Sequence, residues 1–192
     1  MSKVILKDVR ASYVFIKEPR QETNKDDLGN EVVSERYSMQ ILIRKDDAEQ
    51  VNAIKAAIKA AAVARFGASV KMGMLKLPLR DGDEEREEEE YQGRYFINAN
   101  TYHRPGIVNR HNKAPSDSEL EELCYSGAFF HVSVTFKAFD FEGKKKGIRV
   151  ELGNVMLLRQ GERLDGSVSA EKEFEEFAEP ESAPPADEDF DF

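Results

Sequence analysis

Tryptophan is absent from this chain of 192 residues, and cysteine occurs only once, at Cys124. A single cysteine cannot form an intramolecular disulfide, so nothing indicates a disulfide-stabilised secreted protein. No apolar run approaches the roughly 20 residues that a membrane-spanning helix needs. The first residues also lack the apolar core of a signal peptide. These absences predict a soluble protein of a reducing cytoplasm without a membrane partner.

The sequence motifs of common enzyme classes are missing as well. There is no phosphate-binding loop of the GxxxxGK[ST] type, no GxSxG nucleophile elbow and no HExxH zinc motif. Cys124 and the three histidines do not have the spacing of a zinc finger or a zinc ribbon. We therefore expect no catalytic residue, no metal site and no cofactor. One enzyme alternative stays open, a metal-dependent nuclease that uses Asp81, Asp83 or Glu85 together with His103.

Acidic side chains are absent from residues 91–113, although 34% of the chain is charged. Cations neutralise phosphates and any base can stack on an aromatic face, so cations interleaved with rings are typical of proteins that bind single-stranded nucleic acid. A half-buried strand followed by a polar loop would produce the same pattern. The cations and rings of this stretch are Arg94, Arg104, Arg110 and Lys113 with Tyr91, Tyr95, Phe96 and Tyr102.

The net charge of −9 is distributed unevenly along the chain. Residues 171–192 hold ten acidic residues and one lysine, and residues 81–90 hold eight acidic residues and one arginine. The rest of the chain has 26 basic and 19 acidic residues, so we expect a basic folded body. The acidic total therefore does not argue against a nucleic-acid partner.

Apolar periodicity predicts several strands and one helix. The helix is expected to begin at Asp46, as its N-cap, and to stop at Gly67. Residues 19–31 and 140–147 are predicted to be hairpin connections, and residues 75–79 a short edge strand. Alternation of apolar and polar residues predicts strands within residues 4–16, 36–44, 94–100, 125–139 and 148–159.

Strands of this kind with one helix favour a mainly β protein, an OB-fold-like, partly closed five-stranded barrel with one inserted α-helix. This domain is predicted to span residues 1–169. Residues 170–192 lose all periodicity and are predicted to form a disordered acidic tail. Acid alternating with phenylalanine suggests a motif that docks its rings in a basic pocket of a partner, whereas a plain acidic tail would serve solubility. The motif residues are Asp187, Glu188, Asp189, Phe190, Asp191 and Phe192.

The candidate nucleic-acid contacts lie on the expected outward faces of the strands and in their turns. The candidates for base stacking are Phe96, Tyr102, Phe129 and Phe139. The candidates for phosphate contact are Arg94, Arg104, Lys113, Lys137, Lys144, Lys145 and Lys146, with His103 and His131 as further hydrogen-bond donors. Packing in the core would explain the rings equally, and plain solvation would explain the basic side chains.

Several segments occur in an order that is shared with a known family. They are GRYFINAN (residues 93–100) with Arg104-Pro105-Gly106, Tyr125-Ser126-Gly127 leading into VSVTF (residues 132–136), GIRVELGNVMLLR (residues 147–159) and the final DEDFDF. In this order the chain resembles bacteriophage single-stranded DNA-binding proteins, which have an OB-fold core and an acidic C-terminal tail that ends in Phe. The acidic run at residues 83–90 departs from that pattern.

The resemblance implies a non-catalytic protein that coats single-stranded DNA during phage replication and recombination in the host-cell cytoplasm. It also implies that the tail binds replication proteins such as a polymerase, helicase or primase. The oligomeric state stays open, a homodimer included. A further alternative is an interaction protein whose tail mimics the charge of DNA and which does not bind oligonucleotides.

Overall fold

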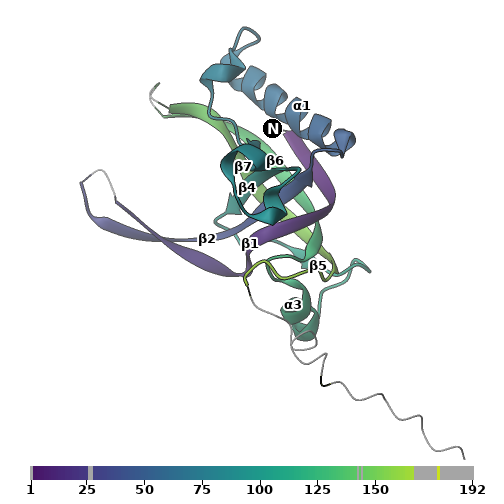
Figure 1. The fold of residues 1–192 in the computed structure, drawn as a ribbon. Helices are drawn as coiled ribbons and strands as arrows, with labels where there is room; N and C mark the ends of the chain where they lie inside the picture. Colours follow the sequence, from purple (N-terminus) through teal and green to yellow (C-terminus); the bar gives the residue numbers. More distant parts are fainter. Residues whose placement is uncertain (1, 26–27, 142, 144, 167–176, 178–192) are drawn as a thin grey trace, which may run out of the picture.

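The computed structural model describes residues 2–25, 28–141, 143, 145–166 and 177, and its centre is a β-barrel (Figure 1). The barrel consists of β1 (Ser2–Lys25), β2 (Glu31–Arg44), β4 (Arg94–Thr101), β6 (Phe129–Phe141) and β7 (Lys145–Arg159). Antiparallel pairs join these strands in the order β4-β2-β1-β6-β7, and a parallel pairing of β4 with β7 closes the ring. The predicted OB-fold-like barrel is therefore confirmed.

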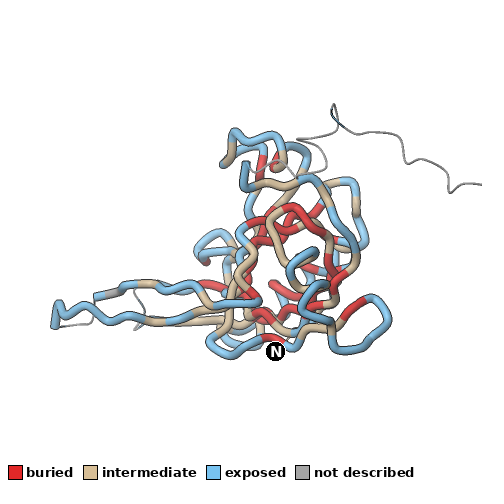
Figure 2. The backbone as a smooth tube through the Cα atoms, turned by 90° about the horizontal axis from the view of Figure 1, so that it is seen from below, coloured by how far each residue is buried: buried red, intermediate tan, exposed pale blue. Residues whose placement is uncertain are grey.

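The barrel interior is filled by the apolar side chains that alternate along each strand, which Figure 2 shows as a buried centre. The predicted inward faces of β4 and β6 are confirmed, because Ile97, Ala99, Phe130 and Phe136 are fully buried. The helix α1 (Ala48–Phe66) packs against β1 and β6, and Ile54 is its most deeply buried large side chain. Two-residue strands β3 (Arg80–Asp81) and β5 (Ile107–Val108) pair with β4 and β7.

The ends of the helices show how local capping sets their bounds. The N-cap of α1 is Asp47 and not the expected Asp46, because the carboxylate of Asp47 accepts the backbone N–H of Gln50 at 3.1 Å. Asp46 pairs instead with Arg44. The predicted stop at Gly67 is confirmed, with a φ of 88°. The short helix α3 (Asp117–Leu123) begins at Ser116, which forms a reciprocal capping box with Glu119.

A two-stranded arm extends away from the barrel, as Figures 1 and 2 both show. It corrects the prediction of a polar connection at residues 19–31, since β1 and β2 stay paired from Arg20–Arg36 to Lys25–Glu31. The edge strand predicted at residues 75–79 is also wrong. A turn of 3-10 helix, η1 (Met72–Met74), precedes a single bridge from Lys76 to Gly147.

The acidic segment, residues 81–91, folds against the outside of the barrel. It contains the one-turn helix α2 (Gly82–Glu85) and the 3-10 turn η2 (Glu89–Tyr91). The ring of Tyr91 meets the ring of Phe96 edge to face at 5.4 Å, and Leu42 completes this small buried cluster. The barrel thus has a second apolar cluster on its outer surface, beneath the acidic segment.

Candidate nucleic-acid interface

The outer face of β2 and β4 presents a graded row of cross-strand pairs. Directly paired residues of antiparallel strands point to the same side of the sheet. At one end lies a pair of arginines, the buried cluster follows, and the other end is polar. The pairs in this order are Arg44 with Arg94, Leu42 with Phe96, Gln40 with Asn98, and Ser38 with Asn100.

The acidic segment covers the apolar part of this face and is held there by ion pairs. Lys45 donates to Asp81 at 2.5 Å and to Asp83 at 2.7 Å, and Arg80 pairs with Glu85. The hydrogen bonds to Asp81 and Asp83 raise the pKa of Lys45, and the bond from Lys45 lowers the pKa of Asp83. These carboxylates are therefore engaged with cations in this structure.

The prediction that the ring of Phe96 stacks on a base is wrong. Its side chain is fully buried, and the guanidinium groups of Arg80 and Arg86 lie 4.9 and 5.5 Å from its ring centre. The hydroxyl of Tyr91, which is buried beside it, donates to the side chain of Gln40. Sequence alternation correctly placed Phe96 outside the barrel, but the acidic segment then covers its ring.

Arg94 lies at the arginine end of the face and is half-buried. Burial lowers the pKa of its guanidinium, and the nearby charges of Arg10 and Arg44 lower it further. One guanidinium nitrogen donates to the backbone oxygen of Glu90 at 2.8 Å. Arg94 therefore helps to hold the acidic segment in place, and its positive charge belongs to a local cluster of cations.

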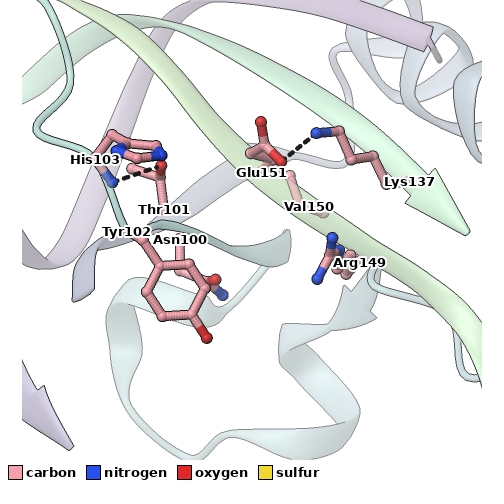
Figure 3. Close-up of a pocket in the computed structure, with 8 residues that line it drawn as sticks. All are labelled: Asn100, Thr101, Tyr102, His103, Lys137, Arg149, Val150 and Glu151. Atoms are coloured by element: carbon pink, nitrogen blue, oxygen red, sulfur yellow. Dashed lines mark hydrogen bonds and ion pairs between the residues drawn. The ribbon is translucent and has the colours of Figure 1, made fainter. Parts of the chain in front are cut away.

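Three of the predicted contact residues line one pocket of about 270 Å³, where β4 meets β7 (Figure 3). They are Tyr102 and His103, which directly follow β4, and Lys137 of β6. Arg149 and Glu151 of β7 complete the polar lining, and Lys137 pairs with Glu151. We call this cavity the seam pocket, because it lies over the pairing that closes the barrel.

The aromatic ring at the seam pocket is accessible and supported from one side. Tyr102 is 60% exposed, and the guanidinium of Arg36 lies 4.7 Å from its ring centre. Arg36 also donates a hydrogen bond of 2.6 Å to the hydroxyl of Tyr102. A flat exposed ring backed by a cation, with His103, Lys137 and Arg149 nearby, can accept both a base and its phosphates.

The structure places Phe129 and His131 at the opposite end of β6 from Lys137. The guanidinium of Arg159 lies 4.0 Å from the ring centre of Phe129. The Nδ1 atom of His131 accepts the backbone N–H of Asp8 at 2.9 Å, where β1 bulges and Asp8 has a φ of 51°. Both side chains thus have local packing or bonding roles and lie away from the seam pocket.

The other predicted contacts form separate groups. Phe139 lies 5.6 Å from the ring of Phe141, and its tip fits against Gly147, where a Cβ atom would collide with it. Lys146 lines a larger groove of about 890 Å³ together with Arg65 and Lys71. Lys145 begins β7, and Lys144 and the tail motif at residues 187–192 lie outside the described residues.

Arg104 lies between β4 and β5, and Lys113 lies between β5 and α3. Arg104 lines a small pocket with Pro105 and Leu120, and Lys113 is exposed beyond the turn that Asn109 organises. Neither residue lines the seam pocket. Sequence reasoning missed Arg36 and Arg149 as candidates for contact, although the alternation within their strands places both on the outer face.

The described residues contain no group of three or more His, Cys, Asp or Glu side chains arranged to hold a metal ion. Across the same residues, no helix is long and apolar enough to cross a membrane.

Comparisons with known proteins agree on one group of phage proteins. Protein p50 of Acyrthosiphon pisum secondary endosymbiont phage 1 is 27% identical over 185 residues, which cover 92% of this chain and 94% of p50. The single-stranded DNA-binding protein of bacteriophage Enc34, solved in complex with single-stranded DNA, matches with a TM-score of 0.67 at 22% identity. That match covers 85% of this chain and 89% of the Enc34 protein.

A more distant solved structure has the same fold. It is gp2.5, a single-stranded DNA-binding protein encoded by bacteriophage T7, with a TM-score of 0.55 at 15% identity over 88% of this chain and 98% of gp2.5. The model of the family described as "Enterobacter phage Enc34, ssDNA-binding protein" matches residues 2–184. Since this match spans nearly the whole sequence, the chain belongs to the Enc34 single-stranded DNA-binding protein family.

Proposed function

We propose that this protein binds single-stranded DNA without sequence preference and coats it during phage replication and recombination, with no catalytic step. Membership of the Enc34 family supports the ligand class. The observation that carries the proposal is the exposed ring of Tyr102, backed by Arg36 at the edge of the cationic seam pocket. It combines a stacking surface with phosphate contacts in one place.

The physical account of binding has two parts. Stacking on an aromatic side chain contributes about 1–3 kcal/mol for each base and tolerates any sequence, because every base has a flat face. Each phosphate contact to a single strand adds about −0.7 to the slope of log affinity against log salt. The candidates for these contacts are Lys137, Arg149 and His103 at the seam pocket, with Lys145, Lys146, Arg104 and Lys113 further along the surface.

The proposal is tested by fluorescence anisotropy with labelled oligo-dT. We expect Tyr102→Ala to weaken binding by roughly 5- to 150-fold, the equivalent of one lost stack. The matched control is Tyr102→Phe, which keeps the ring and loses only the hydrogen bond from Arg36. A wild-type protein that leaves oligo-dT unbound would overturn the proposal, and cleavage of the strand on addition of Mg²⁺ would favour the nuclease alternative.

The proposal extends to the acidic tail, residues 170–192, which follows a DNA-binding domain of residues 1–169. We infer that the tail docks replication proteins such as a polymerase, helicase or primase, and that it competes with DNA for the basic surface. Its net charge of −9 over residues 171–192, against 26 basic and 19 acidic residues in the chain outside this tail and residues 81–90, supports this competition. A tether of this length reaches at most about 75 Å, which is enough to return to the barrel at high effective concentration.

A further inference from the structure

The strand β1 contains a bulge with an unusual backbone. β1 pairs with β2 at Ser12–Gln40 and next at Phe15–Ser38, so two residues of β1 oppose one residue of β2. Tyr13, the first of the two, has a φ of 49°. This left-handed conformation is uncommon for a bulky residue and costs free energy. Strained conformations of this kind tend to be retained at functional sites.

Burial of the ring does not compensate for this strain, since Tyr13 is 50% exposed. Glycine or asparagine would adopt the same backbone more readily. The fold alone thus does not account for a tyrosine here. What the tyrosine adds is a flat aromatic surface that solvent can reach.

The ring of Tyr13 lines a pocket of about 380 Å³ that no predicted contact residue lines. Phe15, Tyr125 and the hydroxyl-bearing Ser12 and Ser126 belong to the same lining. Two acidic residues, Glu90 and Asp165, also line it, and Asp165 pairs with Arg163. Carboxylates repel phosphate, whereas aromatic faces, hydroxyls and carboxylates all suit a nucleobase, whose edge offers donors and acceptors.

A continuous row of residues connects this pocket to the seam pocket. Ser38 pairs with Phe15 on one side and with Asn100 on the other. Phe15 lines the Tyr13 pocket and Asn100 lines the seam pocket. Two strand spacings, about 10 Å in all, therefore separate the linings. Arg20, 5.9 Å from the ring centre of Phe15, and Arg36, beside Tyr102, supply cations along this outer face.

The geometry points to a nucleobase-binding pocket at the β1 bulge, in which Tyr13 stacks on one unpaired base of the strand whose neighbouring nucleotides occupy the seam pocket. This inference rests on the proposed binding of single-stranded DNA and adds a second stacking position to it. The pocket takes the base and not the phosphate. Removal of the Tyr13 ring therefore weakens the affinity for single-stranded DNA without changing the number of phosphate contacts.

The test replaces Tyr13 with residues that suit its backbone. Tyr13→Gly and Tyr13→Asn remove the ring but accept the left-handed conformation, so both variants should stay folded by circular dichroism and thermal melting. We expect each to bind oligo-dT roughly 5- to 150-fold more weakly with an unchanged salt slope. The control Tyr13→Phe keeps the ring and should bind within about twofold of wild type, because stacking uses the ring face.

The outcomes separate the inference from the proposed function. Wild-type affinity in the folded Tyr13→Gly variant would overturn the pocket while leaving DNA binding intact. A salt slope reduced by about 0.7 in magnitude would mean that a phosphate is lost, which also overturns it. Binding of no oligonucleotide by wild type would overturn both proposals. Photocrosslinking to oligonucleotides that contain 5-iodouracil should yield an adduct on the Tyr13 peptide, and an adduct confined to peptides elsewhere would count against the pocket.

Discussion

Two rings at the residue scale, Phe96 and Tyr102, show how one sequence pattern yields opposite roles. Both belong to the cation-rich stretch at residues 91–113. Phe96 is fully buried under Arg80 and Arg86, whereas Tyr102 is 60% exposed. The difference comes from the acidic segment, which covers one ring and leaves the other free for a ligand.

Phe96→Ala should therefore act on stability and not directly on binding. Removing a fully buried phenylalanine costs about 3–5 kcal/mol, and the cluster with Tyr91 and Leu42 would lose its centre. We expect the free energy of unfolding, measured by urea titration, to fall by that amount. Tyr102→Ala is the matched comparison and should change it by less than about 1 kcal/mol, since surface substitutions have small effects. Equal losses in the two variants would contradict this assignment.

At the scale of elements, the acidic segment occupies the face that OB-folds use for oligonucleotides. Its glutamates at positions 84, 87 and 89 are exposed. Because like charges repel, replacing all three with glutamine should strengthen binding to oligo-dT by a few-fold at about 50 mM salt and by less at about 200 mM. The control is the same change at three exposed glutamates in the arm or next to it, residues 18, 31 and 35. Unchanged affinity and site size in the first variant would remove this role.

The elements also show what the sequence could predict. The helix α1 and the strands β4 and β6 were predictable because their periodicity is local and their apolar faces, such as Ile97 and Phe136, meet the core. The arm was not, since Pro19 and Gly29 are typical of loops and no core lies behind the paired strands to impose alternation. The cover over Phe96 depends on Tyr91 reaching Gln40, 51 residues away in sequence, and no local pattern encodes that contact.

The candidate site was predictable in part for the same reason. Alternation indicated that Lys137 faces outward, and Tyr102 was predicted from the cations and rings of residues 91–113. The meeting of the two residues depends on the parallel pairing of β4 with β7, which brings distant segments together. Tyr13 gave no signal, because in sequence it is one aromatic residue within an apolar strand. Its significance comes from a backbone angle and an exposed ring.

At the scale of the whole molecule, residues 1–170 hold 27 basic and 27 acidic residues, so the net negative charge of the chain lies in its C-terminal segment. Deleting residues 171–192 removes a net charge of −9. We expect the truncated protein to bind oligo-dT more tightly, and most clearly at low salt, since charges of the tail would no longer compete with DNA phosphates. The measurement is a parallel anisotropy titration of both proteins at several salt concentrations. Equal or weaker binding after truncation would contradict competition by the tail.

The closure of the barrel has a mechanical consequence. β4 and β7 share only two residue pairs, Ala99–Val150 and Asn100–Glu151, against eight pairs between β4 and β2. Local opening of a barrel is expected first at the pairing with the fewest residue pairs. A ligand that binds across this pairing stabilises the closed barrel. Amide hydrogens bonded between β4 and β7 should therefore exchange faster in the free protein than those bonded between β2 and β4, and slow markedly with bound oligo-dT. Exchange that is already slow without DNA would mean that the barrel is closed without a ligand. Exchange that slows only with DNA would mean that each bound strand of DNA stabilises the barrel that binds it.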